Sequence, residues 1–494
     1  MVRPRTLAVA AATAFGVFAC ADPAGISNPV PSAAKGPVVA APGRYMVGFK
    51  GTPAISPSVL ASSGGSIVDS IPKMNVLVVD GVTNPDALKA AQPSYIESGF
   101  TATVAPVAND QPVPDAATDV PGQTSTAWYA TNVLWGMKEI HADAGWATTN
   151  GGAGINACIL DTGVDSLHQE LSARVTKRAN FVTAEPRIDD PAGHGSHVAG
   201  TVAGSGVVIS GVAPRANIMS SRVLNAAGSG YESQIINGLI WCVDNGAHVI
   251  NISLGGVRYV GTSAYNNSVI TYTAAVKYAT DAGVVVLTAA GNSNLKLPNP
   301  AEVFVPAQIA GTVVIGATGP LTKSTNTAIP GWDPFDPNQV WRSPDYKAYY
   351  SNFGPGVQVF APGGRGTVPL SEPYRFYNRV SQGGPNDQIW SVCSGQTTQL
   401  GAANSAGQPV GSASCANNTS RYIAYAGTSM ATPHVTGMAA ILYEALGGVR
   451  SATNRAHVEA CIRNTTDNIG PSDTYGGGRV NLQSALAALR AGTC

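Results

Sequence analysis

Residues 427–437, with the sequence GTSMATPHVTG, constrain the fold of this chain more than any other segment. Gly427 allows backbone angles and close contacts that other residues avoid, and Thr428 and Ser429 are favourable residues at a helix start. Apolar residues follow at helical spacing, at positions 435, 438, 439, 441 and 442. Pro433 then falls in the first helical turn, where its missing N–H costs little. The segment predicts a turn that places Ser429 at the start of a buried helix.

Upstream of this helix, mainly apolar runs alternate with helical patterns. The apolar runs are typical of strands buried on both faces of a sheet, and they lie at residues 155–160, 216–223, 249–254, 284–288 and 312–315. Helical patterns lie at 233–243 and 268–282, and further helices are predicted near 435–446, 454–463 and 481–490. The alternation predicts an α/β fold, a doubly wound and mainly parallel sheet with helices on both faces. Active sites in such sheets lie at the carboxyl ends of the strands.

Four polar side chains occur where these elements begin or end. Asp161 directly follows the strand predicted at 155–160, His194 opens an apolar helix, and Asn292 ends another predicted strand. A serine hydroxyl such as that of Ser429 needs an adjacent base. His194 can accept its proton, and Asp161 can orient the imidazole. Asn292 and the backbone N–H of Ser429 can donate hydrogen bonds to the oxyanion formed on an attacked carbonyl.

Three motifs occur in a characteristic chain order, namely Asp-Thr-Gly at 161–163, His-Gly-Ser-His-Val-Ala-Gly at 194–200 and Gly-Thr-Ser-Met-Ala-Thr-Pro-His at 427–434. In this order they resemble the motifs of the subtilisin-like serine proteases, the subtilase family. The resemblance covers residues 135–489. It implies a serine endopeptidase that hydrolyses peptide bonds in proteins through an Asp-His-Ser triad and an asparagine oxyanion hole.

The resemblance also implies how a peptide substrate is bound. Two segments would flank the substrate strand, one consisting of Gly228, Ser229 and Gly230 and the other of Ser253, Leu254, Gly255 and Gly256. The second segment would form one wall of the primary specificity pocket, and the opposite wall would include Ala290 and Gly291. A pocket with glycine walls suits a large apolar side chain, but loops outside these motifs also shape it, so the sequence leaves the residue preference at the cleavage site open.

The loop that follows the histidine motif, at residues 204–210, is short. It lacks the longer Asn-rich calcium loop of many bacterial members, which together with Asp-Thr-Gly at 161–163 indicates the proteinase K-like branch. The loop also speaks against a calcium site at this place. A structural calcium ion elsewhere is left open, with ligands that the sequence does not assign, and no cofactor is expected for catalysis.

Residues 1–21 have the pattern of an export signal peptide, because Arg3 and Arg5 precede a short apolar stretch and residues 19–21 fit a cleavage site. The same region resembles a loose bacterial lipobox in which Cys20 would carry a lipid. Residues 22–42 are rich in Pro, Ala, Gly and Ser and are predicted to be a spacer. We expect a secreted protein, with lipid anchoring of the precursor through Cys20 as an alternative.

Residues 43–105 resemble the inhibitory prosegment of the same family, through the segments 44–50 and 95–98. In the family, the enzyme itself cuts this small α+β unit off, and the unit then blocks the cleft. We therefore expect a zymogen whose own prosegment is an intramolecular inhibitor. The first cut is predicted between residues 100 and 105, because Pro106 makes the bond before it a poor substrate.

The rest of the chain divides into a linker and a catalytic domain. Residues 106–130 are predicted to be the linker, since they begin with a run rich in Pro, Asp, Ala and Thr. Residues 131–494 are predicted to be the catalytic domain. Within that domain, residues 364–420 interrupt the strand–helix rhythm and are interpreted as a surface insertion.

Six of the seven cysteines remain when Cys20 is set aside. An even number in an exported chain predicts disulfides, although the sequence alone cannot choose among the pairings. Two plausible pairs are Cys393 with Cys415 and Cys461 with Cys494. Cys158 and Cys242 lie on apolar elements and are interpreted as buried thiols.

Composition excludes several kinds of partner. The 29 basic residues balance the 29 acidic ones, so nothing indicates a nucleic-acid partner. No apolar run beyond the N-terminus is long enough to span a bilayer. We expect a monomer that acts on polypeptide substrates, and a mature enzyme without stable membrane association.

Four other interpretations fit the sequence less well. An aspartic protease would need a second Asp-Thr-Gly, and a zinc site would need a third ligand beside His194 and His197. An esterase would need Gly-x-Ser-x-Gly, whereas Ser429 stands in Gly-Thr-Ser-Met-Ala. An inactive binding module would not need all four catalytic positions to be filled.

Overall fold

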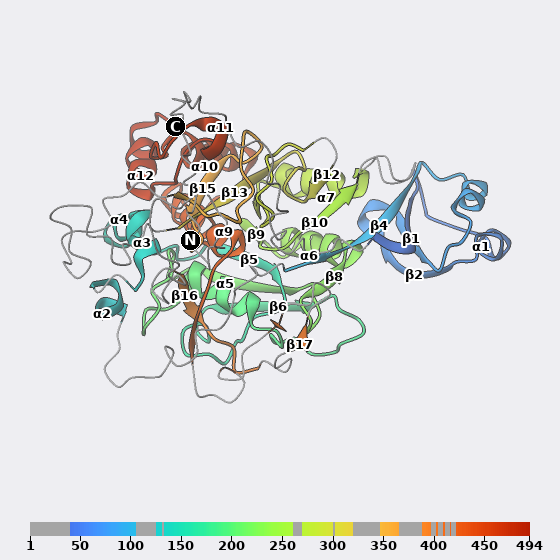
Figure 1. Ribbon diagram of the computed structural model, residues 1–494, viewed down its shortest axis with the longest axis horizontal. Coiled ribbons are helices and arrows are strands. Elements are labelled where there is room, and N and C mark those ends of the chain that lie inside the picture. The colour runs from blue at the N-terminus through green and yellow to red at the C-terminus, as the bar shows by residue number, and fades with distance from the viewer. Residues whose placement is uncertain are drawn as a thin grey trace, which may run out of the picture.

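The computed structural model shows a mainly parallel β-sheet covered by helices, and an antiparallel β region at the N-terminus that projects to one side (Figure 1). The structure describes residues 40–104, 125–130, 133–259, 269–299, 302–319, 346–364, 388–396, 402–403, 409–410, 415 and 421–494. No helix within these ranges is long and apolar enough to cross a membrane.

The apolar runs of the sequence form the central sheet. Its strands are ordered β14 (Tyr346–Lys347), β13 (Thr312–Gly319), β11 (Val285–Ala289), β9 (Val249–Ile252), β5 (Asn156–Asp161), β7 (Asn217–Arg222) and β6 (Val175–Asn180), and β15 (Val359–Pro362) also pairs with β13. All these pairings are parallel except that of β13 with β14. Every residue of β9 and β11 is buried, as expected for strands covered on both faces. The predicted α/β fold class is confirmed.

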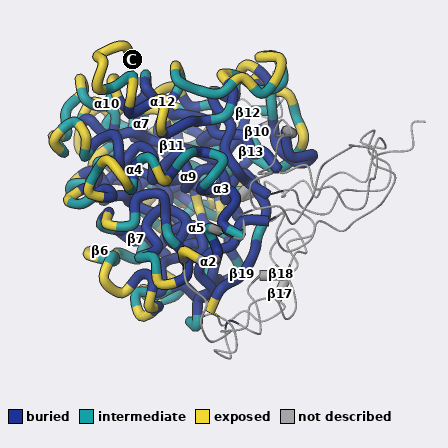
Figure 2. The backbone as a smooth tube through the Cα atoms, turned by 90° about the vertical axis from the view of Figure 1, so that its left-hand side faces the viewer, coloured by how far each residue is buried: buried dark blue, intermediate teal, exposed yellow. Residues whose placement is uncertain are grey.

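Two pairs of helices cover the two faces of the sheet. The first pair is α5 (His194–Ala203) with α9 (Thr428–Ala445), and the second is α6 (Glu232–Asp244) with α7 (Ile270–Asp281). Alternate side chains of β5 point to opposite faces, so Ile159 packs with the first pair and Leu160 with the second. Figure 2 shows that α5 and α9 run through the buried interior, which explains their apolar sequences.

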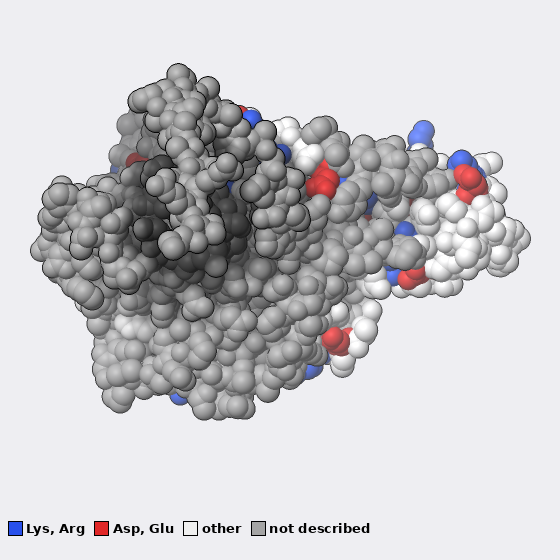
Figure 3. Space-filling model, viewed as in Figure 1, with Lys and Arg blue, Asp and Glu red and all other residues white. Residues whose placement is uncertain are grey.

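The N-terminal β region consists of four antiparallel strands. They are β1 (Ala40–Gly48), β2 (Ser66–Ile71), β3 (Val76–Asp80) and β4 (Tyr95–Thr103), with α1 (Pro57–Ser63) and two 3₁₀ turns at Pro72–Met74 and Pro85–Ala91. On the face in Figure 3, the charged side chains of the described residues in this region are of both signs and interspersed. β4 continues into the main body, where it pairs with β8 (Ser229–Tyr231).

Shorter elements complete the described chain. The helices are α2 (Ser125–Ala130), α3 (Trp135–Glu139), α4 (Ala142–Thr148), α10 (Ala452–Asn464), α11 (Ser472–Tyr475) and α12 (Leu482–Ala491). The strands are β10 (Gly256–Tyr259), β12 (Glu302–Val305), β16 (Ile389–Val392), β17 (Ala402–Ala403), β18 (Pro409–Val410) and β19 (Tyr422–Tyr425).

Three local predictions differ from the structure. α9 begins at Thr428, so Pro433 lies inside the helix and not in its first turn. The end of the predicted linker forms α2, whose Trp128 packs against Trp390 at a centroid distance of 5.3 Å. β16, within the predicted surface insertion, is wholly buried, because its apolar side chains pack in the core beside α5. Other parts of 364–420 lie outside the described residues.

The disulfide prediction is confirmed for two pairs and wrong for the third. Cys393 bonds to Cys415 and Cys461 bonds to Cys494, but Cys158 and Cys242 also form a disulfide. Cys158 lies on β5 and Cys242 on α6, and their Cα atoms are 6.0 Å apart. Both were interpreted as buried thiols because each stands in an apolar pattern. Only the packing of α6 on the sheet brings them together.

We expect replacement of both Cys158 and Cys242 by alanine to lower the free energy of unfolding by about 2–4 kcal/mol, because the bond closes a long loop in the unfolded chain. The loop spans 84 residues, against 22 for Cys393 and Cys415. The alanine pair at Cys393 and Cys415 is the matched control and should cost less. Denaturant unfolding measures both, and equal losses would contradict the loop-length argument.

Candidate active site

Asp161 and His194 meet at the carboxyl edge of the sheet. Asp161 is the last residue of β5 and is fully buried, while His194 is the first residue of α5. The Nδ1 atom of His194 lies 2.8 Å from Oδ1 of Asp161. The backbone N–H of Thr162 donates to the same carboxylate oxygen at 2.7 Å. The side chain of His194 keeps 13% of its surface exposed, so the ring is held by the carboxylate at Nδ1 and is partly open to solvent.

A second carboxylate, Asp190, joins these two elements. Its Oδ1 accepts hydrogen bonds from the hydroxyl of Thr162 at 2.7 Å and the backbone N–H of Gly193 at 2.8 Å. Its Oδ2 accepts from the backbone N–H of Ser196 at 2.7 Å. Burial raises the pKa of Asp190, and its hydrogen bonds oppose that rise. Asp190 was not predicted from the sequence; its one local signal is a carboxylate shortly before a helix start, where the unpaired backbone N–H groups favour negative charge.

Ser429 and Ser253 exchange two hydrogen bonds. The hydroxyl of Ser429 donates to the carbonyl of Ser253 at 3.0 Å, and the hydroxyl of Ser253 donates to the carbonyl of Ser429 at 2.9 Å. Pro433 explains the second bond, because it has no N–H to donate to the carbonyl four residues before it. Asn251 donates to the hydroxyl of Ser253 at 2.9 Å, and Thr436 donates to Asn251 at 2.8 Å.

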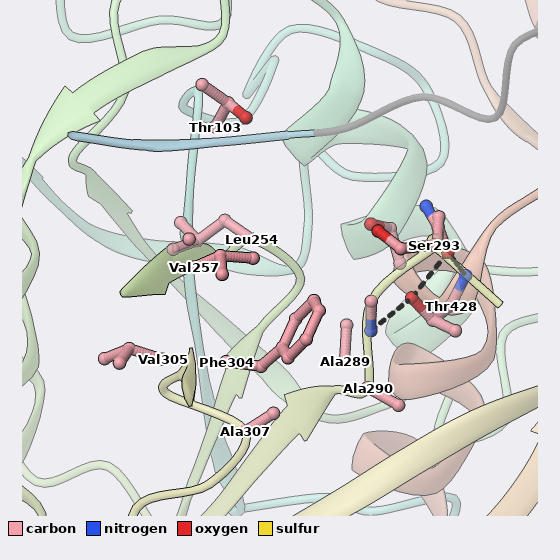
Figure 4. Close-up of a pocket in the computed structure, with 15 residues that line it drawn as sticks. Thr103, Leu254, Val257, Ala289, Ala290, Ser293, Phe304, Val305, Ala307 and Thr428 are labelled. Atoms are coloured by element: carbon pink, nitrogen blue, oxygen red, sulfur yellow. Dashed lines mark hydrogen bonds between the residues drawn. The ribbon is translucent and has the colours of Figure 1, made fainter. Parts of the chain in front are cut away.

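Asn292 follows β11 and has a fixed amide orientation. Its Oδ1 accepts hydrogen bonds from the backbone N–H of Thr428 at 2.9 Å and from the Thr428 hydroxyl at 2.8 Å. The hydroxyl oxygen of Thr428 in turn accepts from the backbone N–H of Gly291 at 3.2 Å (Figure 4). Because the oxygen of the amide is bound to Thr428, the Nδ2 end is the one that can donate to a substrate.

The cleft beside Ser429 opens into a pocket. Its lining consists of Thr103, Leu254, Gly255, Gly256, Val257, Ala289, Ala290, Gly291, Asn292, Ser293, Phe304, Val305, Ala307, Thr428 and Ser429. The structure thus brings both predicted walls and two of the four predicted catalytic residues to one cavity. No charged side chain belongs to the described lining. Thr103, Val257, Phe304, Val305 and Ala307 are among the lining residues that belong to no motif.

The predicted substrate-flanking segments lie on either side of strand β4. Thr103 of this strand pairs with Ser229 of β8, and Ala102 pairs with Gly230. On the other side, Thr103 exchanges backbone hydrogen bonds of 3.1 and 3.2 Å with Gly255. The carbonyl of Gly228 accepts a hydrogen bond from the backbone N–H of Val104 at 3.0 Å. Both segments therefore present backbone groups to an extended strand between them.

The second histidine of the motif does not share a site with His194. His197 is fully buried, and its Nε2 lies 2.9 Å from the carbonyl of Ile389. Burial lowers the pKa of His197 to about 3 and that of His434 to about 4. Both rings are therefore neutral at neutral pH, and each occupies a core position.

The residues of the loop after α5 do not fit a calcium ion. The buried carboxylate of Glu170 accepts hydrogen bonds from four consecutive backbone N–H groups, those of Gly206, Val207, Val208 and Ile209. Calcium would need oxygen atoms turned toward it. The loop turns backbone N–H groups toward Glu170 instead, so the conformation of the loop is fixed by hydrogen bonds to this carboxylate.

Comparison with known proteins defines the class of the protein. A model described as the subtilase family, Peptidase S8, matches residues 152–478. Subtilisin Savinase from Lederbergia lenta is 31% identical over 358 residues, which cover 72% of this chain and 99% of that protein. Thermitase from Thermoactinomyces vulgaris is 32% identical over 362 residues, with coverage of 72% and 97%. The protein is a serine endopeptidase, and the chain belongs to the subtilase family.

Solved structures support the fold. Fervidolysin from Fervidobacterium pennivorans, described as a keratinolytic enzyme related to subtilisin, matches with a TM-score of 0.62 and 24% identity, over 90% of this chain and 61% of that one. The epidermin leader peptide processing protease EpiP from Staphylococcus aureus matches with a TM-score of 0.61 and 19% identity, over 90% and 97%. Membership of the proteinase K-like branch stays a prediction.

We expect Ser253→Ala to lower kcat about tenfold with little change in KM, because the loss of one hydrogen bond to a buried carbonyl costs about 1–2 kcal/mol and lets Ser429 shift. Ser220→Ala is the matched control, since Ser220 is a buried serine whose hydroxyl has no partner among the described atoms. Hydrolysis of a peptide anilide measures both variants. Equal kcat values for the two would contradict a positioning role of Ser253.

Proposed function

We propose that this chain is a secreted endopeptidase, made as a zymogen, in which Ser429 attacks the peptide carbonyl. In this mechanism His194 takes the hydroxyl proton during the attack and gives it to the leaving amine. Asp161 keeps the imidazole in one tautomer and stabilises its positive charge. Water then hydrolyses the acyl-enzyme with the same histidine as base. Apart from water, every group in this scheme comes from the chain, so we expect no cofactor for catalysis.

The observation that carries this proposal is the 2.8 Å contact between Nδ1 of His194 and Oδ1 of Asp161. A proton on Nδ1 is held by the carboxylate, which leaves Nε2 with a lone pair for the proton of the nucleophile. The oxyanion role of Asn292 is supported by its fixed amide and by its place in the same pocket lining as Ser429. The start of α9 adds backbone N–H groups and the positive end of a helix dipole.

Inhibition by the prosegment is supported by the position of β4 in the cleft. The strand pairs with β8 on one side and with Gly255 on the other, as a substrate backbone would. Its earlier residues contact α7, and its last residue, Thr103, belongs to the same pocket lining as Ser429. The chain therefore approaches the nucleophile from N to C, and we propose that the first cut lies C-terminal to Thr103. Residues 105–124, which follow, lie outside the described residues.

Charged contacts hold the prosegment on the enzyme. The buried carboxylate of Glu97 accepts hydrogen bonds from the backbone N–H of Ile270 at 2.5 Å and of Thr271 at 3.0 Å, at the start of α7. A carboxylate at a helix N-terminus is favourable because unpaired N–H groups point at it. Arg258 of β10 donates to the carbonyl of Ser98 at 2.7 Å. Glu97 and Ser98 belong to the proposed prosegment, and their partners belong to the catalytic part of the chain. These contacts therefore support inhibition by the bound prosegment.

Secretion is supported by the three disulfides, which are typical of oxidising compartments, and by the signal-like residues 1–21. The signal-like segment and Cys20 lie outside the described residues. If Cys20 carries a lipid, the anchor is attached to the removed part, and maturation releases the enzyme.

We expect secreted Ser429→Ala to keep its prosegment, whereas the wild type loses about 100 N-terminal residues, because the nucleophile also performs the first cut. Intact mass and N-terminal sequencing of both proteins measure this. Ser220→Ala should mature like the wild type. Processing of Ser429→Ala to the wild-type mass would mean that another protease makes the cut.

We expect Asn292→Ala to lower kcat by about a hundred- to a thousandfold, because one donor to the oxyanion is lost in the transition state only. KM should change little, since the ground-state carbonyl gains less from that donor. Steady-state hydrolysis of a peptide anilide, with the enzyme concentration set by active-site titration, measures both constants. Full turnover by Asn292→Ala would refute the oxyanion assignment.

A further inference from the structure

The pocket beside Ser429 has a floor that comes from outside the family motifs. Strand β12 pairs antiparallel with β10, and its residues Phe304 and Val305 stand opposite Val257 and Gly256. Both Phe304 and Val305 belong to the pocket lining. A methyl group on Gly255 would lie 3.1 Å from the carbonyl oxygen of Val305. β12 therefore abuts one glycine wall of the pocket directly.

The ring of Phe304 reaches the opposite wall. A methyl group on Gly291 would lie 3.3 Å from Cδ1 of Phe304. In Figure 4 the ring projects between Leu254 and Val257 on one side and Ala289 and Ala290 on the other. Only 6% of Phe304 is exposed, so most of the ring is packed and a small part faces the open pocket. The space that the glycine walls leave open is thus partly filled by the chain itself.

The ring is held firmly in this position. The backbone N–H of Phe304 donates to Oε1 of Gln308 at 2.9 Å, and the backbone N–H of Gln308 donates to the carbonyl of Phe304 at 2.7 Å. The side chain also belongs to a small core cluster with Leu297 and Ala307. Moving the ring aside would open that cluster, and close-packed interiors resist such changes. A substrate therefore meets Phe304 as a fixed floor.

We propose that Phe304 sets the depth of the primary specificity pocket and makes the enzyme prefer a small, uncharged side chain, alanine above all, before the cleaved bond. The inference rests on the proposed protease function and goes beyond it. A phenylalanine or leucine side chain would have to enter the space of the ring, whereas a methyl group fits above it. The uncharged lining leaves an ionised side chain without a partner. Glycine walls alone would suit a large apolar side chain, and the ring of Phe304 takes up part of the space that they leave.

The test compares mature enzymes on tetrapeptide anilides that differ only in the last residue, with alanine, leucine or phenylalanine. For the wild type we expect kcat/KM for alanine to exceed that for phenylalanine at least tenfold, since pocket contacts of this size discriminate by about 10–200-fold. Phe304→Ala should raise the kcat/KM of the phenylalanine substrate at least tenfold and change that of the alanine substrate only a few-fold. Phe304→Leu keeps more of the core and should give an intermediate shift, even if Phe304→Ala does not fold.

Val303→Ala is the matched control, because Val303 is the neighbour of Phe304 on β12, packs against another core cluster and lies outside the pocket lining. It should leave the ratio of the two kcat/KM values unchanged. A wild type that prefers phenylalanine, or a ratio that neither Phe304 variant shifts, would overturn the role of Phe304. Wild-type enzyme that cleaves none of the anilides, nor an unfolded protein substrate, would instead refute the proposed function.

Discussion

The burial of the central strands on both faces is the constraint on which the rest of the structure depends. β9 and β11 are buried throughout and β5 is buried beyond Asn156, so the polar groups of the candidate site lie where these strands end. Asp161 closes β5 and Asn292 follows β11, and helices that pack on the sheet present His194 and Ser429 at the same edge. The stability of the core and the geometry of the site therefore come from the same packing.

A helix-breaking residue contributes to this geometry. Pro433 removes the N–H that would normally bind the carbonyl of Ser429, and the hydroxyl of Ser253 takes its place. Ser429 is thus tied to the segment that follows β9 and continues into the pocket lining. The chain from Thr436 through Asn251 extends the connection back into α9. The carbonyl that Pro433 leaves without a helical partner thus forms a hydrogen bond that joins α9 to the segment after β9.

The cleft uses backbone groups for general recognition and side chains for selection. The backbone groups of β8 and Gly255 pair with an extended strand, which in this structure is the chain's own β4. Backbone pairing carries little information about side chains. The choice between substrate side chains must then be made in the pocket, where Phe304 narrows the space between the two glycine walls.

Much of the fold and most of the site could be predicted from the sequence, because periodicity and motifs are local. The apolar runs identified the strands of the sheet to within a few residues, and the motifs identified Asp161, His194, Asn292 and Ser429, which lie at the predicted element ends. The run rich in Pro, Asp, Ala and Thr that begins at residue 106 also set the N-terminal β region apart from the rest of the chain. Errors arose where local pattern was ambiguous, as at β16, whose apolar residues stand between polar loops.

The sequence by itself determined the class of fold, the order of the elements and the chemistry of the candidate groups, since each depends on residues close together in the chain. Only the tertiary structure decided which residues far apart in the sequence come into contact. It paired Cys158 with Cys242, set Asp190 between the two elements that carry Asp161 and His194, and brought Phe304 under the pocket. No periodicity encodes such contacts, because they depend on how whole elements pack.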